Sequence, residues 1–225
     1  MYQYDEETAK ARIASKIAEE FSKMSKERDL FVNLGVGIPT MVADYIDSKR
    51  VFLQAENGML GVGPAACEGE CDPLLINAGR IKVTETPGCS YFDSSISFGM
   101  IRGGHIDATV IGAFQVDQEG NIANWIIPGG KMLGVGGAMD LVTGARKVYV
   151  AMQHVSKKGQ PKILVKCTLP ITGYEKIFAI VTEYAVFRFR DRTMYLEEIC
   201  PNISINELKE ITPAEYIVSE KLINF

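Results

Sequence analysis

The first third of the chain alternates between apolar residues at helical spacing and short continuous apolar runs. Residues 6–24 predict a helix, because apolar side chains recur there every three or four positions and would share one face. Acidic residues come early in this segment and lysines late, which the helix dipole favours. The runs at 30–35 and 51–53 predict strands. Residues 36–46, with Pro39 near the start, predict a turn that enters a second helix.

The remainder of the chain predicts more strands than helices. Residues 106–116 and 147–153 are nearly continuous apolar runs, which is typical of buried strands. A Gly-Asn pair within residues 117–126 predicts a hairpin. Further strands are expected within 76–88, at 162–169, and as a final pair at 178–190 and 194–199. Capped helices are expected at 90–104, 136–145, 204–211 and 212–223.

The order helix, strand, helix, strand is typical of a parallel sheet with connections on both of its faces. We therefore expect an α/β fold with an open, mostly parallel sheet covered by helices on both faces. Some antiparallel strands are expected toward the C-terminus. No repeat, low-complexity tract or linker interrupts the pattern, so residues 1–225 are expected to form a single domain.

Composition narrows the function classes. The chain has 225 residues, 47% of them hydrophobic, and a formal net charge of -4. The basic residues form no run, which argues against nucleic acid as a partner. The apolar stretches are too short or too interrupted to span a bilayer, and the N-terminus is acidic where a signal peptide is basic. We expect a soluble, cytoplasmic protein that binds no membrane.

Cysteine usage is consistent with a reducing compartment. The five cysteines are an odd number, which favours free thiols over a disulfide framework. Cys67 and Cys71 could share a helical face, and His105 or His154 could complete a metal site. A zinc site usually repeats a tighter pair of ligands, so we expect no metal.

One carboxylate stands at an unusual position. The predicted strand at 51–53 leads directly to Glu56, which is followed by a glycine-rich segment. A carboxylate at the end of a buried strand loses hydration, so it needs a partner charge or a function. The nearest cations in the sequence are Lys49, Arg50 and Arg80, and none stands beside it. Glu56 is therefore a candidate catalytic residue.

Three glycine clusters, "LGVGIP", "NGMLGVGP" and "PGGKMLGVGGAMD", fall where a strand ends and a helix is expected to begin. In open α/β sheets this carboxyl edge is where ligands bind, and glycine lets main-chain N–H groups approach a ligand closely. Each cluster alone is explained equally well by the demands of a turn. None has the sequence of a phosphate-binding Walker loop or a complete dinucleotide fingerprint.

These residues resemble a known family. "LQAENGMLGVGP" is similar to the glutamate signature of the β subunit of family I CoA-transferases, which include 3-oxoacid and butyrate–acetoacetate CoA-transferases. "FVNLGVGIPTMVADYI", "DSSISFGMIRGGHIDATVIGAFQVD" and "GGAMDLVTGARKVYVAMQH" resemble the family in the same order. Ala55 replaces the serine that usually precedes the glutamate. The CoA-binding signature of the α subunit has no counterpart in these residues.

The resemblance implies roles for individual residues. Glu56 would be the nucleophile that becomes a glutamyl-CoA thioester. Asn33 and the main-chain N–H near Gly137 would stabilise the oxyanion that forms during attack. Without the resemblance, Asn33 is interpreted as a turn residue and Gly137 as a helix entry. The supporting glycine loops are represented by Gly35, Gly37, Gly58, Gly61 and Gly136.

The resemblance also implies a reaction and partners. CoA would move from a short acyl-CoA, such as acetoacetyl-CoA or butyryl-CoA, to a small carboxylate by a ping-pong mechanism. The CoA thioester is a substrate, so no cofactor is expected. A separately encoded α subunit would complete the enzyme as a hetero-oligomer.

Two alternatives from other classes stay open. A sugar-phosphate isomerase-like enzyme would use the glycine loops for phosphate, but these loops offer only Lys131 as a cation. A non-catalytic partner subunit would hold Glu56 as a satisfied core acid.

Overall fold

The computed structural model describes residues 4–67, 69, 72–129 and 134–225. Its helices are α1 (Glu6–Met24), α2 (Ile38–Met41), the 3₁₀ helix η1 (Val42–Tyr45), α3 (Ser94–Arg102), α4 (Ala138–Gly144) and α5 (Ile205–Glu210). Its strands are β1 (Leu30–Leu34), β2 (Val51–Ala55), β3 (Met59–Ala65), β4 (Val83–Tyr91), β5 (Ala108–Ile111), β6 (Gln115–Asp117), β7 (Ile122–Ala123), β8 (Val148–Ala151), β9 (Ile163–Leu164), β10 (Ile177–Val181), β11 (Ala185–Arg190), β12 (Thr193–Ile199) and β13 (Ile217–Asn224).

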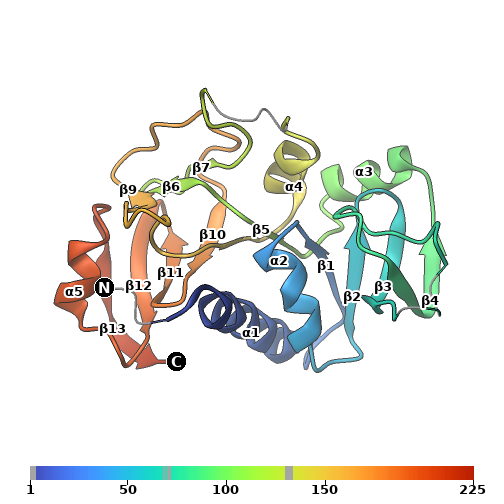
Figure 1. Cartoon of the computed structure of the whole chain (residues 1–225), viewed down its shortest axis with the longest axis horizontal. Coiled ribbons are helices and arrows are strands. Elements are labelled where there is room, and N and C mark those ends of the chain that lie inside the picture. Colours follow the sequence, from blue (N-terminus) through green and yellow to red (C-terminus); the bar gives the residue numbers. More distant parts are fainter. Residues whose placement is uncertain (1–3, 68, 70–71, 130–133) are drawn as a thin grey trace.

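Ten of the described strands form one sheet in the order β13-β12-β11-β10-β8-β5-β1-β2-β3-β4. The centre, from β10 to β2, is entirely parallel. Antiparallel pairs flank it, with β3 and β4 at one end and β11 and β12 at the other (Figure 1). The expected α/β fold with a mostly parallel sheet is confirmed, together with its antiparallel strands near the C-terminus.

Helices cover both faces of the sheet. On one face, α1 packs Ile13, Ile17 and Phe21 against alternate residues of β1, β5 and β8. On the other face, Ile101 of α3 and Leu141 of α4 form a second cluster. Residues of the small sheet β7-β6-β9 and of the C-terminal strands pack together in one large core cluster. The helix predicted at residues 6–24 is confirmed with the same bounds.

The helix predicted at 212–223 is wrong. Residues 217–224 form β13, which pairs in parallel with β12 at the edge of the sheet. The β-branched residues Ile217, Val218 and Ile223 suit an extended strand, and pairing with β12 outweighs the local helical pattern. The capped helix predicted at 204–211 is confirmed as α5, which begins with a capping box.

The glycine-rich segment after β2 enters a strand, so the expected helix there is wrong. Residues 59–65 form β3, which turns back antiparallel to β2. Gly58 makes this turn possible at φ 127°, and a Cβ there would lie 2.0 Å from the Phe92 carbonyl oxygen. Antiparallel strands therefore also occur in the first half of the chain, at the β4 edge of the sheet. The sequence did not indicate them.

Three further strands have different limits from those expected. Residues 106–116 divide at Gly112 into β5 and β6, which belong to different sheets. Only Ile163–Leu164 of the run 162–169 pairs as a strand. Residues 178–190 hold parts of two strands, β10 and β11, joined by a tight turn. Apolar runs locate buried chain, but pairing partners set where each strand ends.

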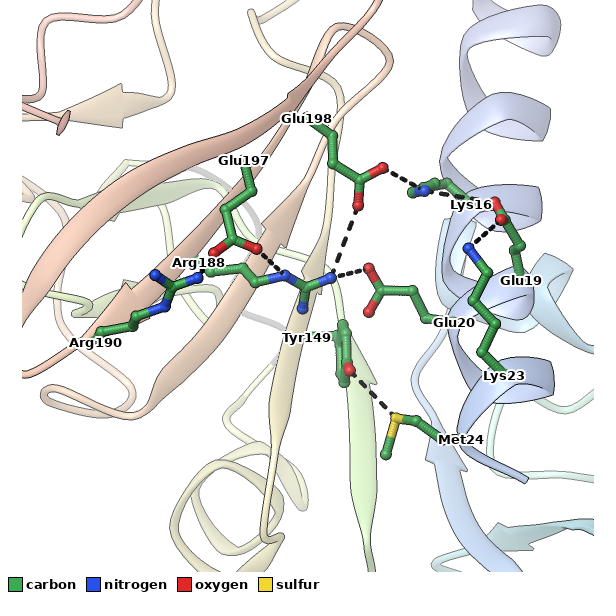
Figure 2. A network of polar contacts seen from close by, with 10 residues as sticks. All are labelled: Lys16, Glu19, Glu20, Lys23, Met24, Tyr149, Arg188, Arg190, Glu197 and Glu198. Carbon is green, nitrogen blue, oxygen red and sulfur yellow. Dashed lines mark hydrogen bonds and ion pairs between the residues drawn. The ribbon is translucent and has the colours of Figure 1, made fainter. Parts of the chain in front are cut away.

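A network of buried charges joins α1 to β11 and β12 (Figure 2). At its centre Arg188 contacts Glu20 of α1, and it pairs with Glu197 at 2.7 Å. Lys16 pairs with Glu198 at 2.5 Å, and both side chains are under a tenth exposed. Charges buried at this depth depend on each other for compensation.

We expect Arg188→Met to destabilise the fold by about 3–5 kcal/mol, because it leaves the largely buried Glu20 carboxylate without its ion pair and removes one of the two arginine partners of Glu197. Urea denaturation of the purified chain measures the change. Arg192→Met is the matched control: its ion pair with Glu175 is mostly exposed, so about 1 kcal/mol or less is expected. Equal losses for both variants would contradict the prediction.

None of the helices in the described part of the chain has the length and apolar character needed to cross a membrane.

Candidate active site

The carboxyl ends of the central parallel strands meet at one edge of the sheet, where the structure has a cavity of about 480 Å³. Its lining includes Gly35 after β1, Glu56 after β2, Gly112 after β5 and Met152 after β8. Four successive strands therefore contribute to one cavity, at the edge where open α/β sheets bind ligands.

Glu56 occupies the turn between β2 and β3. Its side chain is half-buried and lines the cavity, and it forms no ion pair within the described part of the chain. Gly137, at the start of α4, lies against it: a Cβ on Gly137 would come 3.6 Å from Glu56 Cγ and 3.1 Å from the Phe98 ring. Glycine at this position thus brings the start of α4 within van der Waals reach of the Glu56 side chain without crowding the Phe98 ring.

Asn33 lies in β1 beside Glu56. Its side chain is fully buried, and Nδ2 donates to Glu56 Oε2 at 3.1 Å. The same nitrogen donates to Gln54 Oε1 at 2.8 Å. The interpretation of Asn33 as a turn residue is therefore wrong, since the residue is in a strand and its amide holds the carboxylate.

A row of buried polar residues supports this contact, and sequence reasoning missed it. Gln54 and Thr109 stand in register with Asn33 on either side, across β2 and β5. Gln54 Nε2 donates to Ser97 Oγ of α3 at 2.7 Å, and Thr109 Oγ1 donates to Asn33 Oδ1 at 3.4 Å. Gln54, a polar residue inside an apolar strand, was a sequence signal for this row. Its partners depend on the register between strands, which the sequence does not give.

The expected glycines do not all reach the cavity. Gly35 and Gly136 line it together with Gly137. Gly37 lines a separate, mostly apolar cavity on the α2 side. Gly58 and Gly61 instead allow close packing of the β2–β3–β4 edge, where a Cβ on Gly61 would lie 2.9 Å from Cys89 Cα. At Gly58 and Gly61 the close backbone approach therefore serves the packing of these strands.

Lys162 also lines the cavity, and nothing in the sequence singled it out. Burial lowers the pKa of this lysine to about 8, and the negative charge of Glu183 offsets only part of that effect. Lys131, the cation considered for a phosphate loop, lies outside the described residues.

The histidines and cysteines do not assemble a metal centre in the described part of the chain. His154 is fully buried, and its two ring nitrogens bond to the hydroxyls of Thr182 and Thr212. Burial lowers the pKa of His154 to about 3, so the ring is a neutral, satisfied core group. His105 and Cys67 are exposed, and Cys71 is outside the described residues.

Comparison with known proteins gives consistent findings. Residues 27–210 match the family model described as coenzyme A transferase. The chain is 48% identical to one subunit of a probable succinyl-CoA:3-ketoacid coenzyme A transferase of Bacillus subtilis, over 86% of this chain and 90% of the relative. It is 47% identical to the β subunit of the acetate CoA-transferase of Escherichia coli, over 95% of this chain and 96% of the relative.

Among solved structures, the fold is similar to an acyl-CoA transferase from Escherichia coli O157:H7, with a TM-score of 0.74 and 18% identity. That match covers all of this chain but only 44% of the solved chain, so the present chain spans less than half of that protein.

Proposed function

The chain belongs to the coenzyme A transferase family, and we propose that Glu56 is the nucleophile of its transfer reaction. The observation that supports this most is the state of the carboxylate. Asn33 holds Oε2, while Oε1 accepts no hydrogen bond from the described residues. Glu56 also has no ion pair among them and borders the cavity. A carboxylate that is fixed, partly desolvated and unpaired is suited to attack.

The reaction we infer is an exchange between carboxylates and a thiolate. Glu56 attacks the acyl-CoA carbonyl carbon, the C–S bond breaks, and an acyl-glutamyl anhydride forms as CoA thiolate leaves. The thiolate then attacks the glutamyl carbonyl, which releases the first acid and leaves a glutamyl-CoA thioester. A second carboxylate reverses these steps and departs as the new acyl-CoA. No step changes an oxidation state, so no redox partner is required.

The same groups can stabilise the charge that develops. Attack on the acyl carbonyl creates an oxyanion beside Glu56, where Asn33 Nδ2 and the α4 N-terminus at Gly137 converge. Donors that are fixed in position stabilise such a charge without reorganisation. Gln54 keeps the Asn33 amide oriented.

Short acyl groups and a partner chain complete the proposal. The relatives are named for succinyl-CoA with 3-ketoacids and for acetate, so we infer exchange among small acids, including acetoacetate and butyrate. Both relatives are named as one subunit of a transferase. We infer a cytoplasmic hetero-oligomer with a separately encoded α subunit.

The test is to trap the intermediate. The complex is incubated with acetoacetyl-CoA and then with hydroxylamine, and the peptide containing Glu56 is analysed by mass spectrometry. A hydroxamate at Glu56 that depends on acyl-CoA supports the proposal. Its absence, while CoA still transfers, overturns the assignment. An isomerase or a non-catalytic subunit forms no such adduct.

We expect Asn33→Ala to lower the rate of transfer by about a hundredfold or more, because it removes the donor nearest the oxyanion. Initial rates of the assembled enzyme measure this. Asn202→Ala is the control, since that exposed side chain bonds only Tyr4 among the described residues. A lowered melting temperature with an unchanged rate would show that Asn33 acts only in folding.

A further inference from the structure

A chain of three hydrogen bonds runs from helix α3 to Glu56. Ser97 Oγ accepts from Gln54 Nε2 at 2.7 Å, and Gln54 Oε1 accepts from Asn33 Nδ2 at 2.8 Å. Asn33 Nδ2 also donates to Glu56 Oε2 at 3.1 Å. The side chains of Ser97, Gln54 and Asn33 are buried, so bulk water does not compete for these bonds. Two buried amides therefore connect α3 to the carboxylate.

The hydrogen bonds of this chain all point in a fixed direction. An ionised carboxylate only accepts hydrogen bonds, so the nitrogen of the Asn33 amide has to face Glu56. The same nitrogen faces Gln54, which therefore presents its oxygen to Asn33 and turns its own nitrogen toward Ser97. Thr109 Oγ1 donates to Asn33 Oδ1 at 3.4 Å and supports the same orientation from β5. Each amide is thus oriented by its neighbours.

Glu56 stops orienting the Asn33 amide once it has reacted. In a glutamyl-CoA thioester the side chain has no charged oxygen, and attack by the second carboxylate then creates an oxyanion on the glutamyl carbonyl. That oxyanion needs the N–H of Asn33. At this stage Gln54 and Thr109 are the described residues that still hold the amide, and the bond to Gln54 is the shorter one.

Helix α3 gives the chain a fixed end. Ile101 of α3 is fully buried and packs with Leu141 of α4. Arg102 Nε pairs with Asp140 Oδ1 at 2.7 Å, so the two helices are joined side by side (Figure 1). A supporting hydrogen bond positions a functional group well only when its far end is itself held in place. Ser97 meets this condition.

We propose that Gln54 and Ser97 are positioning residues for CoA transfer: anchored on α3, they keep the Asn33 nitrogen facing Glu56 after the carboxylate has become an acyl intermediate. This inference rests on the proposed function, since it requires the glutamyl intermediate. Neither residue touches the substrate, and both act through Asn33. Loss of Gln54 therefore slows the consumption of the thioester more than the first attack, in which the carboxylate itself orients Asn33.

The test follows one half of the reaction in the complex with the partner subunit. The enzyme is incubated with acetoacetyl-CoA, separated from small molecules by gel filtration and mixed with acetate. Hydroxylamine trapping and peptide mass spectrometry then measure the Glu56 thioester that remains at each time. Gln54→Met keeps the length of the side chain and removes its amide. We expect it to slow consumption of the thioester roughly tenfold to a hundredfold, because a misplaced oxyanion donor loses most of its effect.

Control variants separate this role from packing. Gln115→Met is the matched control: both ends of that amide bond Thr168, and Gln115 is not among the described residues that line the cavity. It should consume the thioester at the wild-type rate. Ser97→Ala removes the acceptor of Gln54 Nε2 and should slow consumption about threefold to tenfold, as for loss of one neutral hydrogen bond. Ser97→Thr keeps the hydroxyl and should restore most of the rate.

A double-mutant cycle shows whether Gln54 acts through Asn33. In the Asn33→Ala protein, adding Gln54→Met should cost less than about twofold, because the group that it positions is already absent. A further loss as large as in the wild type overturns the inference, and so does a wild-type rate for Gln54→Met alone. If Gln54→Met does not fold, the same cycle with Ser97→Ala decides the question by the same criteria.

The wild-type protein separates this inference from the proposed function. If it forms no hydroxamate at Glu56 while CoA still transfers, both are overturned. If it forms and consumes the thioester, and Gln54→Met consumes it equally fast, Glu56 remains the nucleophile and only the positioning role is overturned.

Discussion

We expect Glu56→Gln to abolish CoA transfer while the chain keeps its fold. The amide has nearly the shape of the carboxylate, so packing against Gly137 is preserved. It lacks the anionic oxygen that attacks the thioester, and the glutamyl anhydride cannot form. Initial rates with acetoacetyl-CoA measure the loss, and thermal unfolding verifies the fold. Turnover by a folded Glu56→Gln protein, with deamidation excluded by mass spectrometry, would contradict the assignment.

Glu56→Asp keeps the negative charge of the side chain and changes only the position of the carboxylate. Aspartate keeps the anion but withdraws it by one methylene, and a displacement of about 1 Å from the attack distance can cost roughly a hundredfold. It also pulls the carboxylate away from Asn33 Nδ2. We therefore expect transfer by this variant to be abolished as well. Glu210→Gln, at the exposed end of α5, is the matched control for loss of one carboxylate and should keep the full rate.

Local signals in the sequence predicted those parts of the fold that depend on local interactions. The α1 helix carries its own apolar stripe, and α3 and α5 begin at capping residues, Asp93 and Ser204. These features need no distant partner. By contrast, β13 is a strand because β12 lies beside it, and β3 exists because β2 turns back at Gly58. Such pairing joins residues that no short pattern connects.

The same distinction applies to the site. The sequence indicated Glu56 because a carboxylate directly after an apolar strand is unusual. The strand and the carboxylate lie within a few residues of each other, so a local pattern was enough. Gln54 and Ser97 form one buried contact 43 residues apart, which only the packing of α3 on the sheet creates. Lys162 lines the cavity and directly precedes β9, which pairs with β6 of the small sheet. Its place in the cavity could not be derived from its neighbours in sequence.

The exposed surface around Glu56 bears on assembly. Four apolar side chains on elements that adjoin Glu56 or Gly137 are more than two fifths exposed, and we call them the apolar rim: Val36, Tyr91, Ile96 and Met139. Val36 lines the cavity, Tyr91 pairs with Met59 of β3, and Ile96 and Met139 lie in the first turns of α3 and α4. Exposed apolar groups gathered at a site are typical of surfaces that bind another protein. Covering this rim would also exclude water from Glu56.

We expect this chain alone to transfer no CoA above background, and the rate to appear when the separately encoded α subunit is added. The related chains of similar length are named as subunits, and the solved acyl-CoA transferase has more than twice the length that this chain matches. A second chain would supply contacts to CoA whose binding energy is used at Glu56. The assay measures transfer from acetoacetyl-CoA or butyryl-CoA to a small carboxylate as the α subunit is titrated.

Ile96→Glu in the apolar rim should shift that titration to higher α-subunit concentration. Ile217→Glu, which changes an equally apolar and exposed residue on β13, should not. Full activity of the chain by itself would overturn the division of the enzyme into two subunits.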